Sequence, residues 1–157
     1  MKVVAILLLV ALSFSSCSTP SVTQVAQSAA GGVWSAQVFG GSGEVSGFSF
    51  TTQFTVNTDG SLTITYFQFL TEGSCFPVDG GTQTGSMILT INAATEQLTG
   101  PFTYTVQASN NTLTLNGVVT GTESGTMLTG GSITGTWQVT GTGCSTAGGT
   151  FTMTQSS

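Results

Sequence analysis

Side chains that could carry acid–base or nucleophilic chemistry are scarce in this chain. Among its 157 residues, Lys2 is the only Lys or Arg, and there is no His. Without His or a further Lys, a Ser or Cys nucleophile has no ordinary base to activate it. Without Arg, there is no bidentate clamp for a carboxylate or a phosphate. A pair of carboxylates is therefore the remaining route to catalysis.

The six acidic residues do not single out such a pair. Because they are scattered and mostly adjoin Gly, Ser or Thr, solvated turn charges explain them better than a catalytic site. We therefore predict a protein that is not an enzyme. No cofactor or metal is expected, because the chain has neither His nor a CxxC pair. Nucleic acid is excluded as a partner, because apart from Lys2 the chain has no cation to neutralise phosphates. The acids are Glu44, Asp59, Glu72, Asp79, Glu96 and Glu123.

The three cysteines differ in their surroundings. Cys17 follows Lys2, an apolar run over residues 3–12 and then small residues. This order is typical of a signal peptide for export, and the run is shorter than the roughly 20 residues that span a bilayer. Cys75 and Cys144 lie in Gly-rich turn regions. In an exported protein we predict that they form a disulfide, which closes a loop of roughly 70 residues and is worth about 4 kcal/mol.

The sequence FSSC at residues 14–17 resembles the lipobox of bacterial lipoproteins. The resemblance implies cleavage before Cys17, acylation of that residue and attachment to a membrane through its lipid. Ser18, which is not Asp, implies the outer membrane if the organism is Gram-negative. Residues 1–16 are thus the predicted signal peptide and 17–31 a lipid-anchored flexible tether. The alternative is an ordinary secreted protein that is cut nearby.

Residues 32–157 are predicted to form a single β-domain. Apolar and hydroxyl side chains alternate, as in 98–107, where Phe102 and Tyr104 share one face and Thr103 the other. This period of two is typical of a half-buried antiparallel sheet. Short links favour a meander of about eight strands that closes into a small up-and-down β-barrel, with a two-sheet β-sandwich as the alternative. The expected strands are 33–39, 45–56, 61–70, 82–91, 98–107, 112–121, 131–140 and 147–155.

The aromatic residues suggest a ligand role for such a barrel. The sequences GVW at 32–34 and GTW at 135–137 resemble the G-x-W motif of lipocalins and related calycin barrels, whose Trp closes the barrel floor. A barrel of eight strands can hold one small ligand. The segment 66–70 carries aromatic residues on both faces, which indicates either a bulge or an exposed patch. The predicted ligand-contacting residues are Trp34, Tyr66, Phe67, Phe69, Tyr104 and Trp137.

Two classes of function are favoured over a third, an outer-membrane barrel that spans lipid. Residues 31–155 resemble short Thr/Gly-rich exported lipoproteins of environmental bacteria. The first class is accordingly a membrane-anchored exported lipoprotein with a non-enzymatic structural or interaction role in the cell envelope, where its partner would be another envelope protein. The second is a lipocalin-like barrel that binds a small apolar ligand. We expect a monomer in either case.

Overall fold

A computed structural model describes residues 27–40, 47–70, 81–108, 110–124, 127–142 and 147–156. Cys17, Cys75 and Cys144 lie outside these residues. The predicted signal peptide, acylation site and disulfide therefore stay predictions. Within the described ranges, no helix is long and apolar enough to cross a membrane.

Nine antiparallel strands form one continuous sheet in the described part of the chain. The alternation of apolar and β-branched side chains favours strands throughout, and turns rich in Gly and Asn separate them. The strands are β1 (Gly32–Phe39), β2 (Phe48–Val56), β3 (Leu62–Phe69), β4 (Thr82–Met87), β5 (Thr90–Asn92), β6 (Gln97–Ala108), β7 (Asn111–Ser124), β8 (Met127–Gly141) and β9 (Ala147–Gln155).

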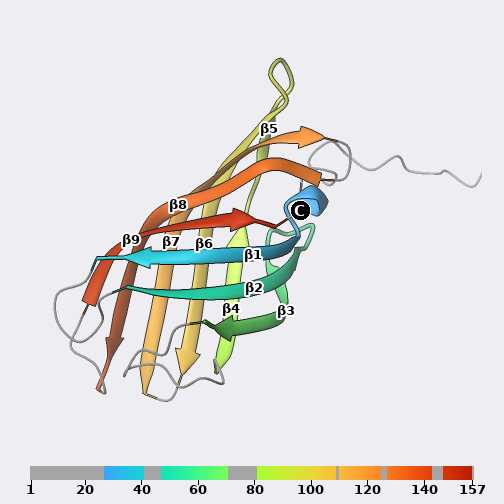
Figure 1. Cartoon of the computed structure of the whole chain (residues 1–157). Coiled ribbons are helices and arrows are strands. Elements are labelled where there is room, and N and C mark those ends of the chain that lie inside the picture. Colours follow the sequence, from blue (N-terminus) through green and yellow to red (C-terminus); the bar gives the residue numbers. More distant parts are fainter. Residues whose placement is uncertain are drawn as a thin grey trace, which may run out of the picture.

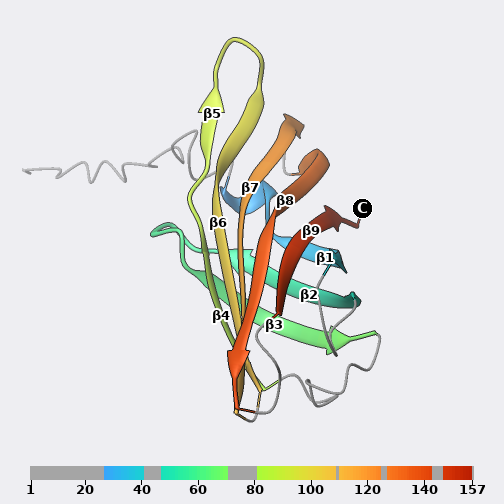
Figure 2. The ribbon, with the colours of Figure 1, turned by 90° about the vertical axis from the view of Figure 1, so that its left-hand side faces the viewer.

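The sheet curls into a nearly closed barrel (Figures 1 and 2). Its order is β3-β2-β1-β9-β8-β7-β6-β4, so β1 pairs with both β2 and β9. Between β3 and β4 the described residues form a single bridge, from Ser61 to Ser86, and the Met87 N–H donates to the Gly60 carbonyl oxygen at 2.7 Å. The predicted all-β, up-and-down barrel is confirmed, and the alternative of two separate sheets is not observed.

The predicted fourth strand, 82–91, is divided into β4 and β5 by a proline on the neighbouring strand. The Ile88 N–H donates to the Pro101 carbonyl oxygen at 3.2 Å. Pro101 cannot return the bond, because proline has no backbone N–H. The ladder with β6 resumes where Thr90 pairs with Thr99. The two strands thus follow the edge of β6 with one interruption, and the β5–β6 hairpin extends beyond the rest of the barrel (Figure 2).

A bulge in β3 explains the aromatic residues on both faces of 66–70. The register with β2 shifts there: Phe54 pairs with Ile64, whereas Gln53 pairs with Tyr66. Thr65 is therefore an extra residue, which reverses the faces for the rest of the strand. Simple alternation predicts Tyr66 on the same face as Ile64. The structure corrects this expectation, because Tyr66 lies on the outer face and is 44% exposed.

The inward faces of the strands form one core, and the outward faces are mostly Thr, Ser and Gln. Along β6 the inward residues are buried and most of the intervening outward residues are exposed. The sheet therefore has an apolar interior and a hydroxylated exterior, which we call the outer wall. The largest fully buried side chains are Trp34, Tyr104, Phe50, Phe54, Phe102, Phe151, Met87, Leu89, Leu98, Leu113, Leu115 and Ile133.

Each tryptophan forms a hydrogen bond at one end of β1. The Trp34 Nε1–H donates to the Ala30 carbonyl oxygen at 3.0 Å, just before the strand. The Trp137 Nε1–H donates to the Phe39 carbonyl oxygen at 2.9 Å, at its last residue. Residues 27–31, the end of the predicted tether, pack against the barrel, since Ala30 is fully buried. The two G-x-W motifs therefore have structural roles at opposite ends of one strand.

Candidate functional site

The aromatic residues predicted to contact a ligand are mostly parts of the packed interior. Trp34, Phe69, Tyr104 and Trp137 are buried, Phe67 is half-buried and Tyr66 is exposed. A continuous series of ring contacts joins the two tryptophans, with centroid separations between 5.5 and 6.4 Å. Such separations are typical of favourable aromatic packing. In order, the rings are Trp34, Phe54, Phe102, Tyr104, Phe50, Phe69, Phe48 and Trp137.

The titratable group in this interior, the Tyr104 hydroxyl, already forms a hydrogen bond. The Tyr104 hydroxyl lies 2.8 Å from Thr52 Oγ1, and Thr52 Oγ1 in turn donates to the Tyr66 carbonyl oxygen at 3.1 Å. Because Thr52 has one hydroxyl proton, Tyr104 is the donor in the first bond. Burial raises the pKa of Tyr104 well above its ordinary value of 10.0, and donation of its proton to Thr52 also favours the neutral form. Tyr104 is therefore a neutral structural group.

The described carboxylates lie at two places on the barrel. Asp59 lies in the turn between β2 and β3, where the Ser61 hydroxyl and N–H donate to its Oδ1 at 2.6 and 2.9 Å. These bonds lower the pKa of Asp59. Glu96 and Glu123 meet at the far end of the β6–β7 ladder, where the Glu123 N–H donates to the Glu96 carbonyl oxygen at 3.0 Å. The described residues contain no group of three or more His, Cys, Asp or Glu that could hold a metal ion.

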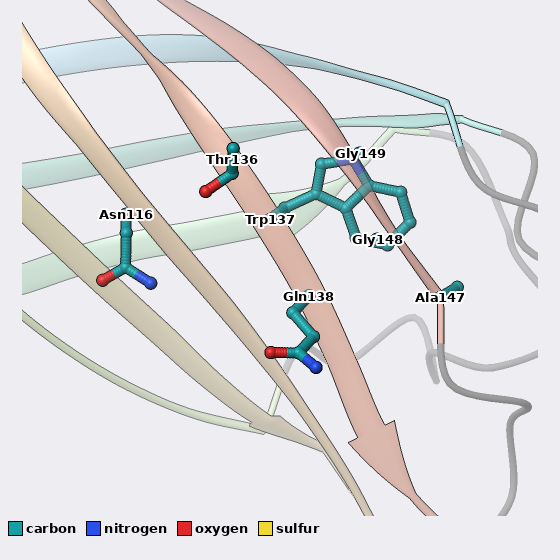
Figure 3. Close-up of a pocket in the computed structure, with 7 residues that line it drawn as sticks. All are labelled: Asn116, Thr136, Trp137, Gln138, Ala147, Gly148 and Gly149. Atoms are coloured by element: carbon teal, nitrogen blue, oxygen red, sulfur yellow. The ribbon is translucent and has the colours of Figure 1, made fainter.

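A groove on the outer wall is a better candidate site. It has a volume of about 380 Å³ and crosses β7, β8 and β9 near the end that holds Phe39. We call it the Gln138 groove. The cross-strand register places Gln138 opposite Gly148 and Thr136 opposite Asn116. Figure 3 shows these side chains on neighbouring strands. The lining residues are Asn116, Thr136, Trp137, Gln138, Ala147, Gly148 and Gly149.

Two adjacent glycines of β9 make room for this groove. Gly148 faces outward opposite Gln138, so the wall has no side chain there. Gly149 lies opposite Trp137, and a Cβ on it would come within 2.8 Å of the indole Nε1 and 2.2 Å of the Phe39 carbonyl oxygen. Only glycine fits at this position. The indole can therefore pack directly against the β9 backbone and support the groove from inside the barrel (Figure 3).

The groove offers uncharged hydrogen-bonding groups. The structure records no hydrogen bond to the side chains of Asn116, Thr136 or Gln138 from any described residue. Each amide can both donate and accept, and the hydroxyl can do the same. In the same cross-strand row, Phe39 pairs with Thr150, which pairs with Thr136. Phe39 is 54% exposed, so an apolar ring lies on the same outer wall, two strands from Thr136.

A second groove lies farther along the outer wall. It has a volume of about 550 Å³, and its lining is again uncharged and includes several hydroxyl and amide side chains beside Leu98. We call it the Thr122 groove. A register shift between Thr120 and Thr122 places Gly130, whose φ is +65°, at its edge. Its lining residues are Asn92, Gln97, Leu98, Thr99, Thr120, Gly121, Thr122, Thr129 and Gly130.

Of the six predicted ligand-contacting residues, Trp137 lines one of these grooves. The other groove residues were missed because Thr, Asn and Gln on an outward face have no distinctive local pattern. The adjacent glycines 148 and 149 are the one usable signal, since glycine inside a strand often marks close backbone approach. No family model, curated protein or solved structure matches this chain.

Proposed function

We propose that this chain is an exported lipoprotein, held at a membrane by an acylated Cys17, whose barrel is a non-catalytic binding domain for an uncharged, hydrogen-bonding ligand. The anchor is inferred from the signal-like sequence over residues 1–17. The binding role is inferred from the Gln138 groove. In the cell envelope, such a domain would hold a polar component of the envelope or its surroundings close to the membrane.

The observation that carries this proposal is the set of neutral groups on Asn116, Thr136 and Gln138, which line one groove and form no hydrogen bond with a described residue. An anionic ligand would find no cation in the lining. A purely apolar ligand would cover the amides and leave them without partners, at about 1–3 kcal/mol for each buried group. A ligand rich in hydroxyl or amide groups satisfies them. The exposed Phe39 ring offers an apolar surface to the same ligand.

The alternative role, an apolar ligand inside the barrel, has less support. The interior is occupied by the aromatic series between Trp34 and Trp137. Its hydroxyl pair, Thr52 and Tyr104, is satisfied internally. A ligand there would have to displace well-packed rings, whereas the Gln138 groove is open to solvent.

The anchor can be tested by mass spectrometry of the full-length protein, made in a host that processes lipoproteins. We expect a chain that begins at Cys17 and carries acyl groups, and a Cys17→Ser variant without them. A wild-type chain that begins elsewhere and is not acylated would refute the anchor.

The groove can be tested by NMR titration with glucose and, as an anionic match, glucuronate. We expect glucose at high concentration to shift the side-chain NH₂ signals of Asn116 and Gln138, and glucuronate to shift them less. Gln53, which is exposed on β2, provides a control signal that should not move. If neither groove amide responds to glucose or to other neutral sugars and amides, the binding role is wrong.

A further inference from the structure

The Gln138 groove and the Thr122 groove lie on the same wall and share β7. Asn116 belongs to the first groove, and Thr120 and Thr122 belong to the second. Val118 lies between them on the same outward face and is 48% exposed. We call Asn116, Val118, Thr120 and Thr122 the β7 strip. At about 3.3 Å per residue, the strip is about 20 Å long.

The middle of the strip is apolar. Val118 pairs with Pro101, and both face outward. Ile88, which lies between β4 and β5 and whose N–H bonds to the Pro101 carbonyl oxygen, is 53% exposed. The outer wall is otherwise mostly hydroxylated. The strip therefore runs from polar groups, across a small apolar patch, to polar groups again.

Charge narrows the class of ligand that suits this strip. Neither groove has a charged residue in its lining. Two described charges, Glu96 and Glu123, adjoin Gln97 and Thr122 in sequence at the far end. Two carboxylates there repel a polyanion. A ligand with many hydroxyl groups, apolar C–H faces and no charge matches both the grooves and the patch between them.

The shape of the outer wall narrows the class of ligand further. The strands of a sheet are rotated by about 20–25° from one to the next, so the outer wall is twisted. A rigid flat surface would touch it at only one place. A single extended chain can follow one strand along its whole length.

We propose that the two grooves are the ends of one extended site, and that an unbranched neutral polysaccharide binds along the β7 strip. This inference rests on the proposed function, because the Gln138 groove is part of the site. Sugar hydroxyl groups pair with Asn116 and Gln138 at one end and with Gln97 and Thr122 at the other. The C–H faces of the sugar rings cover Val118 in the middle.

The experiment is a chain-length series measured on the full-length protein. The probes are cello-, malto- and xylo-oligosaccharides from the disaccharide to the octasaccharide, with polygalacturonate fragments as the anionic match. A chain long enough to reach both grooves makes its second contact intramolecularly, which raises affinity without any new kind of contact. We expect Kd to fall at least tenfold as one of the neutral series passes the length of the strip. The side-chain amide signals of Asn116 and Gln97 should then shift together.

Variants test the two ends separately. Gln97→Ala should weaken binding of the long chain about tenfold and leave the disaccharide that binds the Gln138 groove unchanged. Gln138→Ala should weaken both. Gln53→Ala on β2 is the matched control and should change neither. All three residues are exposed, so these changes should cost little stability.

The outcomes separate this inference from the proposed function. If sugars shift Asn116 and Gln138 with an affinity that does not depend on length, the Gln138 groove binds its ligand but the extended site is wrong. If no neutral sugar shifts an amide in either groove, the extended site is again wrong. The proposed function would then require another uncharged ligand. If polygalacturonate binds as well as the neutral chains, the argument from charge fails.

Discussion

The hydrogen bonds around Tyr104 predict that a double variant is more stable than one of its two single variants. Thr52→Val removes the acceptor of the Tyr104 hydroxyl and the donor to the Tyr66 carbonyl oxygen. It leaves the Tyr104 hydroxyl buried without a partner, which costs about 1–3 kcal/mol, and loses a second bond worth about 1 kcal/mol. We expect the free energy of unfolding to fall by about 3 kcal/mol.

Tyr104→Phe is milder, because Thr52 keeps its own proton on the Tyr66 carbonyl oxygen. One bond is lost, at about 1 kcal/mol, and the ring still packs against Phe50 and Phe102. In the double variant no hydroxyl remains to be buried without a partner. Its loss should be about 2 kcal/mol, smaller than that of Thr52→Val alone and well below the sum of about 4 kcal/mol.

Urea denaturation of the four proteins, followed by tryptophan fluorescence, measures this double-mutant cycle. Trp34 and Trp137 lie at opposite ends of β1 and report on the whole barrel. Equal m-values should accompany the different midpoints. Additive losses, or a double variant less stable than Thr52→Val, would refute the assigned direction of the bonds.

Three further predictions concern pH, the sugar site and the backbone. Because burial raises the pKa of Tyr104 in the folded state, its neutral form stabilises the fold below pH 10. That stability should be lost at about 1.4 kcal/mol per pH unit above pH 10 in urea titrations of the wild type, and not in Tyr104→Phe. Phe39→Ala should weaken the binding of neutral sugars about fivefold by NMR titration, and Phe39→Tyr should restore it. Equal affinities of Phe39→Ala and the wild type would show that the ring does not contact the sugar. Gly135→Ala should cost about 3 kcal/mol by thermal unfolding, because its Cβ would lie 2.0 Å from the Asn116 carbonyl oxygen. Gly130→Ala meets no atom within 4 Å and should cost only about 1 kcal/mol for its positive φ; a larger loss than in Gly135→Ala would contradict this reasoning.

The strands could be predicted from the sequence because each strand shows a recognisable pattern within its own residues. Inward and outward residues alternate with a period of two, and polar turns such as 57–60 separate the strands. The exceptions depend on a neighbouring strand. The predicted fourth strand is interrupted because Pro101, on β6, has no N–H to donate to it. The bulge at Thr65 is defined only by the register of β3 against β2. Neither effect is visible within the segment that it alters.

The grooves could not be predicted in this way. Asn116, Gln138 and Gly148 come from three strands and meet only when the cross-strand register is known. Their residue types are ordinary for an exposed strand. Large aromatic residues are common in ligand sites, but their size also suits them to fill the interior of a barrel. Trp137 belongs to both sets, since its indole packs in the core and supports the Gln138 groove.

The pairing of β1 with β9 has a consequence for the order in which the barrel can assemble. Val38 pairs with Phe48 in β2 and with Phe151 in β9, so one of its partners is near in sequence and the other is more than a hundred residues away. Until β9 arrives, the edges of β1 and β8 both remain open, and such edges invite pairing with other chains. Contacts so distant in sequence also form slowly. Pairing of β9 thus covers two edges at once, and a chain truncated before Ala147 would leave the edges of β1 and β8 open in addition to those of β3 and β4.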